Sequence, residues 1–174
     1  MKSIAASLLI CLCSTHAFAN PCDVRTLPGA IQKSLSKDFQ AWKLVTPALL
    51  EASDRATWLE NYRAECPGMI KGHFQNDGDA YVANLVKTQG GKTLQEVICF
   101  QVNGSDSSRT VIFGPAVIKT VTVIRKFPPG RYRSADKSKS LQVSSDAIGM
   151  SQIDSWTEVF YWDGNSFRRI VTSE

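Results

Sequence analysis

Beyond Gly68, short apolar segments alternate with turns, and this pattern limits the fold more than any other feature of the sequence. Turn sequences such as QGGK, NGSDSS and DGN separate the segments. Strands at such short intervals are typical of a mainly antiparallel sheet. The predicted strands are MIKGHF, AYVANLV, TLQEVICFQV, RTVIFG, TVTVIRKF, SLQV, AIGMSQI, TEVFYW and SFRRIVT.

A first short helix is expected ahead of these strands. The segment LPGAIQKSLSKDF places Ile31, Leu35 and Phe39 at four-residue spacing, which forms one apolar stripe on a helix. The segment WKLVT that follows is predicted to be a strand, and Pro47 stops it because proline has no N–H to donate to a sheet.

A second helix is expected in SDRATWLENYRAECPG, where Trp58, Leu59 and Tyr62 form the apolar face and the Pro-Gly pair ends the helix. The fold class predicted from all segments is α+β. Short N-terminal helices would pack on a mainly antiparallel, curled β-meander.

The N-terminus has the features of a signal peptide. Met1-Lys2 is positively charged, the segment from Ile4 to Cys13 is apolar, and Ala-Phe-Ala at 17–19 fits a cleavage site. We therefore predict a signal peptide at 1–19, cleavage before Asn20, and a single exported domain at 20–174. The apolar core is too short for a membrane span, so the mature protein is expected in the periplasm or outside the cell.

Three cysteines remain after the leader, namely Cys22, Cys66 and Cys99. An odd number in an oxidising compartment usually means one disulfide and one free thiol, and three pairings are open. Cys99 lies in the apolar strand EVICF, where a buried, inert thiol is the ordinary outcome. The favoured pairing is therefore Cys22 with Cys66.

The charge of the mature chain is nearly balanced, because removing Lys2 leaves 19 basic residues against 16 acidic ones. This excess of 3 indicates neither nucleic acid nor a membrane surface as a partner. One stretch, RKFPPGRYRSADKSK, is strongly basic, with interleaved aromatic residues and a single acid, Asp136. It could be a solvated hairpin end, or it could bind an acidic protein or an anionic envelope polymer. The candidate partner-binding residues are Arg125, Lys126, Arg131, Tyr132, Arg133, Lys137 and Lys139.

Catalytic and metal-binding motifs are missing from the sequence. The mature chain has a single histidine, His73, which excludes zinc sites with several histidines. The G-x-S-x-G motif does not occur, and the two S-x-x-K matches lack their companion motifs. We predict no catalytic residues, no metal ligands and no cofactor.

Three segments resemble a group of small exported proteobacterial proteins of uncharacterised function. They are LPGAIQKSLSKDFQAWKLV, DRATWLENYRAECPGMIKGHFQNDGDAYVANLV and SSDAIGMSQIDSWTEVFYWDGNSFRRI. The central piece is similar to one FG-GAP or VCBS-type unit, a calcium-loop hairpin, and the C-terminal piece carries the YWDG hairpin of the group. The resemblance implies export and a β-rich fold, and it implies no particular activity.

Calcium would need six to eight oxygen ligands in this loop. His73 and Gln75 occupy positions where such a loop carries acids, so Asp77 and Asp79 are the carboxylates that remain. We therefore predict that N-D-G-D is a tight hairpin tip without calcium, with Gly78 in the positive-φ conformation that glycine tolerates.

The function expected from the sequence is that of a non-enzymatic, exported binding or inhibitor/immunity-like protein that acts on an envelope or protein partner. One alternative is a hydrolase of envelope polymers that uses His73 or surface carboxylates as acid and base. Another is a purely structural envelope factor.

Overall fold

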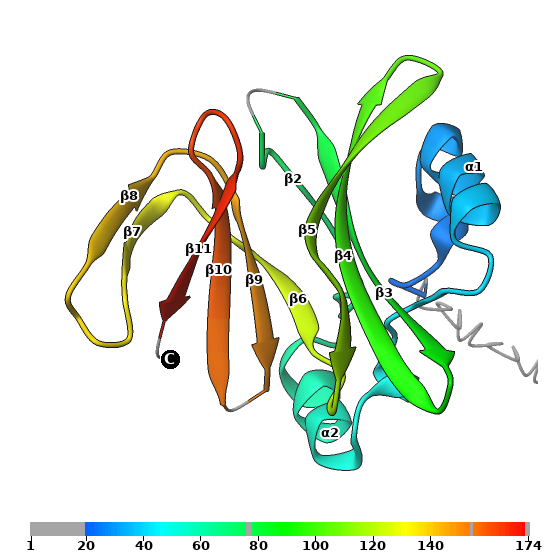
Figure 1. Cartoon of the computed structure of the whole chain (residues 1–174), viewed down its shortest axis with the longest axis horizontal. Coiled ribbons are helices and arrows are strands. Elements are labelled where there is room, and N and C mark those ends of the chain that lie inside the picture. Colours follow the sequence, from blue (N-terminus) through cyan, green and yellow to red (C-terminus); the bar gives the residue numbers. More distant parts are fainter. Residues whose placement is uncertain (1–19, 76–77, 154, 173–174) are drawn as a thin grey trace, which may run out of the picture.

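The computed structural model of this protein describes residues 20–75, 78–153 and 155–172. The signal peptide predicted at 1–19 therefore lies outside the described residues. Two helices precede most of the strands (Figure 1). In chain order the elements are η1 (Val24–Thr26), α1 (Gly29–Asp38), β1 (Lys43–Leu44), η2 (Pro47–Leu49), α2 (Ala52–Asn61), β2 (Met69–Gly72), β3 (Ala80–Gln89), β4 (Lys92–Asn103), β5 (Asp106–Ile118), β6 (Val123–Phe127), β7 (Gly130–Arg133), β8 (Ser140–Val143), β9 (Ala147–Gln152), β10 (Trp156–Trp162) and β11 (Phe167–Thr172).

The first sheet is antiparallel and has the strand order β1-β3-β4-β5, with β2 also paired to β3. The predicted QGGK turn joins β3 to β4 by a two-residue loop between the paired residues Gln89 and Lys92. Both loop residues, Gly90 and Gly91, have positive φ, at 58° and 72°. A two-residue turn with positive φ at both positions matches the twist of the flanking strands, and glycine adopts this conformation most easily.

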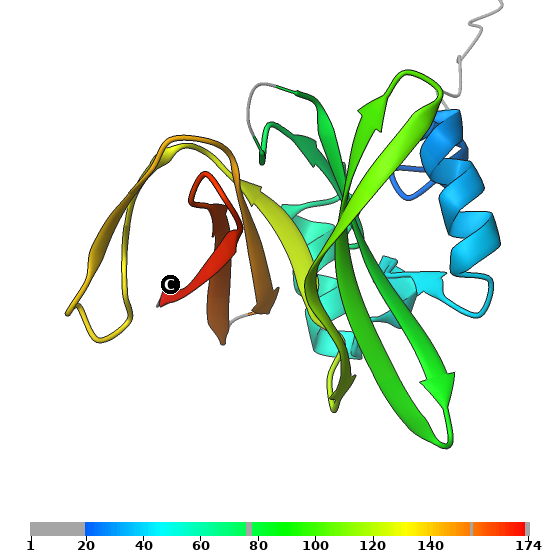
Figure 2. The same cartoon turned by 45° about the horizontal axis from the view of Figure 1, so that its top comes forward.

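The second sheet has the strand order β11-β10-β9-β6, and β7 pairs with β8 in a separate two-stranded arm. Figures 1 and 2 show the arm on the side of the second sheet that faces away from the first sheet. The predicted α+β class with antiparallel meanders is confirmed. The sequence did not indicate that the strands divide between two sheets.

Helix α1 and the two sheets form successive layers (Figure 1). Val82 and Cys99 face a core between the sheets, whereas Leu85 and Phe100 face a second core under α1. Strands β3 and β4 are thus buried on both faces, and alternate residues supply the two cores. The predicted stripe of α1 packs in the second core, where Ile31 is fully buried.

Helix α2 packs in a third core that contains Trp58, which is fully buried, and Tyr62, which is partly buried. Leu59 was predicted on the same face, and this prediction is wrong, because 47% of its surface is exposed. Residues 58 and 62 are four apart and share a helix face, whereas the neighbour at 59 is rotated by about 100° away from it.

The predicted disulfide between Cys22 and Cys66 is present. It ties the N-terminal segment to the end of the connection that follows α2. Among the cysteines that the structure describes, Cys99 is free and buried, as predicted. Burial raises the pKa of this thiol to about 12, which keeps it protonated and unreactive at neutral pH.

A buried group of polar side chains joins the two sheets. The Asn84 side-chain amide donates to the Thr122 carbonyl at 2.8 Å, and the Gln95 amide donates to the Asn84 side-chain oxygen at 2.7 Å. The Gln95 amide also lies 2.7 Å from the Thr122 hydroxyl oxygen. Thr122 immediately precedes β6, so these bonds fix where the second sheet begins relative to the first.

The tight hairpin tip predicted at N-D-G-D falls partly on Asn76 and Asp77, which lie outside the described residues. Strands β2 and β3, which flank it, pair as an antiparallel hairpin with Gly72 opposite Ala80. A Cβ added at Gly78 would meet no other atom within 4 Å. The predicted need for glycine at this position stays a prediction, because the conformation there involves Asp77, which lies outside the described residues.

Within the described ranges, no helix is long and apolar enough to span a membrane.

Removing the disulfide by the double substitution Cys22→Ser/Cys66→Ser should lower the free energy of unfolding by roughly 4 kcal/mol. The bridge closes a loop with a sequence separation of 44 residues, and chain entropy gives about that value for such a loop. Denaturant unfolding of the wild type with and without reductant, and of the double variant, measures the effect. Reductant should bring the wild type to the level of the variant, and a wild type unaffected by reductant would contradict the expectation.

Asn84→Ala should lower the free energy of unfolding by about 3 kcal/mol, because it leaves buried partners in Gln95 and Thr122 without a hydrogen bond and adds a small cavity. Asn165→Ala, in an exposed turn, is the control and should change it by less than about 0.5 kcal/mol. Equal effects of the two substitutions in urea unfolding would show that the buried amides do not join the sheets as described.

Candidate functional site

Strand β6 directs its side chains to two sides of the second sheet. Ile124 enters the core between the sheets, and Phe127 packs with residues under the arm. Arg125 lies two residues from Phe127 and therefore shares its side. Lys126 shares the side of Ile124. One β-strand thus separates the basic residues of this segment onto opposite surfaces.

The arm is held over the second sheet by a few specific contacts. The Ala135 N–H donates to the Val171 carbonyl of β11 at 2.9 Å. The Tyr132 hydroxyl donates to the Pro128 carbonyl, and the Tyr132 ring packs in the core beneath the arm. These contacts fix the arm relative to β6 and β11.

A cavity of about 500 Å³ lies where β6, the arm and the end of α2 meet. We call it the basic pocket. The residues that line it are Tyr62, Arg125, Phe127, Arg131, Tyr132, Arg133, Ser134, Lys137, Thr157 and Thr172.

Most of the candidate binding residues predicted from the sequence meet in this pocket. Those that line it are Arg125, Arg131, Tyr132, Arg133 and Lys137.

Two predicted residues lie elsewhere. Lys126 points away from the basic pocket, to within 3.9 Å of Asp146. Lys139 lines a different depression, next to Arg169. Because side chains alternate along β6, Lys126 lies on the side of the strand opposite the basic pocket. Lys139 lies in the turn that closes the arm and is outside the pocket.

The sequence missed the pocket residues that come from distant segments. Tyr62 follows α2, and Thr157 and Thr172 lie on β10 and β11. Tyr62 was recognised as part of an apolar helix face, but nothing local indicates that its ring meets a strand that begins some sixty residues later.

Aromatic rings hold Arg125 in place. The guanidinium carbon of Arg125 lies 4.2 Å from the centre of the Tyr62 ring and 5.7 Å from that of Phe127. Tyr62 in turn packs on the buried Trp58, with ring centres 5.0 Å apart. The Phe127 ring lies so close to Gly149 that a Cβ there would come within 2.1 Å of it. Both rings are therefore fixed by the core, and the stacking restricts the orientation of the guanidinium.

The basic pocket has an unbalanced charge. Four cations line it, and no aspartate or glutamate does. Within the described part of the chain, the ion pairs of the protein involve other residues. A pocket lined by charges of one sign, with no acid among them, attracts anions.

Asp136, the single acid of the basic stretch, does not neutralise the pocket. Its carboxylate accepts hydrogen bonds from the Ser134 hydroxyl and from the backbone N–H and hydroxyl of Ser138. These bonds, that from Ser134 first, lower the pKa of Asp136 to about 2. The carboxylate thus stabilises the turn of the arm and lies outside the lining of the pocket.

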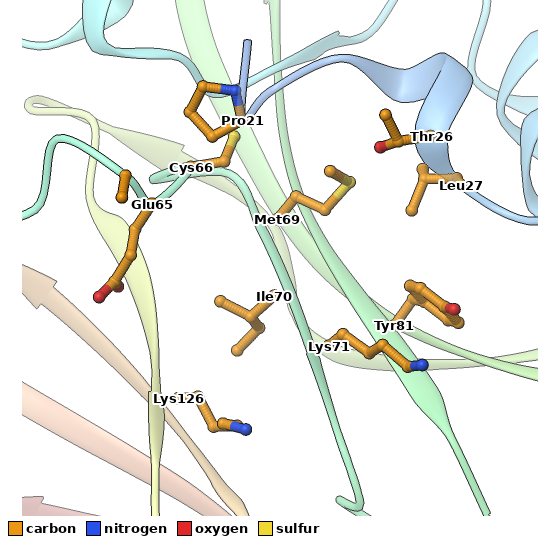
Figure 3. A pocket seen from close by; sticks show the side chains of 11 residues that line it. Pro21, Thr26, Leu27, Glu65, Cys66, Met69, Ile70, Lys71, Tyr81 and Lys126 are labelled. Atoms are coloured by element: carbon orange, nitrogen blue, oxygen red, sulfur yellow. The ribbon is translucent and has the colours of Figure 1, made fainter. Parts of the chain in front are cut away.

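A second cavity, of about 410 Å³, lies beside the disulfide (Figure 3). In Figure 3, Met69 and Ile70 point to opposite sides of β2. The lysines of this cavity already have partners, since Lys71 is 2.6 Å from Asp79 and Lys126 is 3.9 Å from Asp146. The basic pocket is therefore the stronger candidate for binding an anion.

The reactive side chains singled out in the sequence do not form a catalytic group with one another. Cys66 is bound in the disulfide and Cys99 is buried, while His73 lies on the surface, 3.5 Å from Asp79. Among the residues that the structure describes, no three histidine, cysteine or acidic side chains gather where they could hold one metal ion.

No protein-family model matches the chain, and no curated protein or solved structure matches it either. The resemblance to FG-GAP-type hairpins stays a prediction.

The Asp136 carboxyl should titrate in the folded protein with a midpoint near pH 2, well below the ordinary value of about 3.9. The hydrogen bonds from Ser134 and Ser138 stabilise the charged form, so protonation needs a lower pH. Carbon-detected NMR of the side-chain carboxyl measures the midpoint. Ser134→Ala should raise it, and an unshifted midpoint in the wild type would contradict the geometry of the arm turn.

Proposed function

We propose that this protein is an exported, non-enzymatic binding protein that holds an anionic partner in the basic pocket. The partner is an acidic protein, as for an inhibitor or immunity protein, or an anionic polymer of the cell envelope. The observation that carries the proposal is the concentration of four cations, without a carboxylate among them, around one aromatic-lined cavity.

Electrostatics supports binding over a purely structural role for these residues. Surface cations that serve only solubility tend to be interspersed with acids. Here Arg131, Arg133 and Lys137 lie on one short arm and line the same cavity as Arg125. An anionic partner that binds there offsets the repulsion among these like charges.

Two features support export. Residues 1–19 have the pattern of a signal peptide. The Cys22–Cys66 disulfide is of the kind that persists in oxidising compartments such as the periplasm or the cell exterior.

The hydrolase alternative receives no support from this cavity. General acid–base hydrolysis of a sugar polymer needs two carboxyl groups on either side of the bond that is cut. The lining of the basic pocket contains no carboxyl group and no histidine.

Neutralising the pocket should strongly reduce capture of the partner. In the variant Arg125→Gln/Arg131→Gln/Arg133→Gln/Lys137→Gln, we expect at least about tenfold less material bound from an envelope extract at low salt, because each lost charge removes a charge-assisted hydrogen bond. Immobilised protein and mass spectrometry of the eluted material measure this. Capture by the wild type should also fall as salt rises, since salt screens exposed charges.

The matched control changes the same amount of charge elsewhere. Exposed lysines outside the pocket are replaced by glutamine, and these lysines are Lys33, Lys37, Lys92 and Lys119. Circular dichroism and a thermal melt verify that both variants fold. Equal capture by the pocket variant and the control would refute the proposed function.

A further inference from the structure

We propose that the group bound in the basic pocket is a phosphate monoester carried on a sugar ring. This inference rests on the proposed function and names the chemistry of the partner. Three observations lead to it: the state of Arg125, the number and arrangement of the cations, and the shape of the cavity.

The Arg125 guanidinium has a fixed orientation that suits an anion with several oxygens. It is partly buried, and stacking on Tyr62 and Phe127 holds its plane. In the described part of the chain it has no ion pair, and its side chain has no hydrogen-bond acceptor. A fixed fork of N–H donors without protein acceptors is available to bind carboxylate or phosphate in a bidentate manner.

The number of cations favours phosphate over carboxylate. A single carboxylate has one charge and can be satisfied by one arginine fork. Arg125 comes from β6, Arg131 and Arg133 from β7, and Lys137 from the turn after it. Several cations supplied by three segments around one cavity suit a group with nearly two negative charges and three acceptor oxygens, as a phosphate monoester has at neutral pH.

The shape of the pocket favours a group on a small ring over the surface of a protein. An acidic protein partner would need a contact of about 800 Å² on each side, whereas the four cations line a single concavity of about 500 Å³. That volume lies in the range of small-molecule sites. The rings of Tyr62 and Phe127, with the hydroxyl-bearing Thr172, provide a wall for a ring that has both apolar and polar faces.

Such a group can come from a phosphorylated envelope polysaccharide or from a free sugar phosphate, and titration distinguishes the ligands. The probes are glucose 6-phosphate, inorganic phosphate, glucose and glucuronate, measured by calorimetry with the full-length exported protein. We expect glucose 6-phosphate to bind with a Kd below about 1 mM. Glucuronate, which offers a carboxylate on the same ring, should bind at least about tenfold more weakly, and glucose should not bind. A phosphorylated polysaccharide that competes with glucose 6-phosphate, and binds more tightly, would identify the polymer as the source.

Substitution of Arg125 tests the role of its planar group. Arg125→Lys keeps the charge but loses the fork and the stacking, so it should weaken glucose 6-phosphate binding about tenfold. Arg109→Lys is the matched control, because Arg109 is also stacked on a ring, 5.4 Å from the centre of Phe39, but outside the pocket. It should leave binding unchanged.

The outcomes separate this inference from the proposed function. Glucuronate or a polyglutamate peptide that binds as tightly as glucose 6-phosphate would overturn the phosphate inference and favour an acidic partner. Absence of sugar-phosphate binding, with envelope capture still dependent on the four cations, would overturn the inference and leave the proposed function standing. Capture that does not depend on them would overturn both.

Discussion

The structure depends on the junction at residues 66–68, where one short segment is bonded to both sheets. Asn84 of the first sheet donates its backbone N–H to the Gly68 carbonyl at 2.8 Å, and Ile124 of the second sheet donates to the preceding carbonyl at 2.9 Å. A side chain at Gly68 would meet the Val45 carbonyl at 2.2 Å. Because the disulfide also attaches here, the N-terminal segment and the two sheets share one point of fixation.

The polar group at Asn84, Gln95 and Thr122 extends this junction to the start of β6. Its members are almost completely buried, and buried amides accept few arrangements because each unmade hydrogen bond is costly. The group therefore fixes the path of β6 as well as its position. Once the path is fixed, alternation along the strand places Arg125 beside the arm and Lys126 on the opposite surface. The charge of the basic pocket thus follows from a constraint in the core.

Local patterns were enough to predict much of the fold. The QGGK turn, the strands and the pairing of Cys22 with Cys66 follow from residue types and spacing, and all are present. The prediction that failed, the burial of Leu59, depends on tertiary contacts. Leu59 has an apolar side chain, but only the packing of α2 decides which face is buried.

The candidate site shows the same division between local and distant information. The charge of the basic stretch is evident in the sequence. The pocket also needs Tyr62, which comes from another part of the chain. Tyr62 stacks between Arg125 and the buried Trp58, whose indole N–H lies 3.3 Å from the Glu65 carbonyl. Glu65 directly precedes the disulfide cysteine Cys66. An anion that binds Arg125 is therefore held by the most constrained part of the molecule, although the other cations around it belong to the arm. This arrangement provides the preorganisation that makes a stacked arginine a better anion receptor than a mobile one.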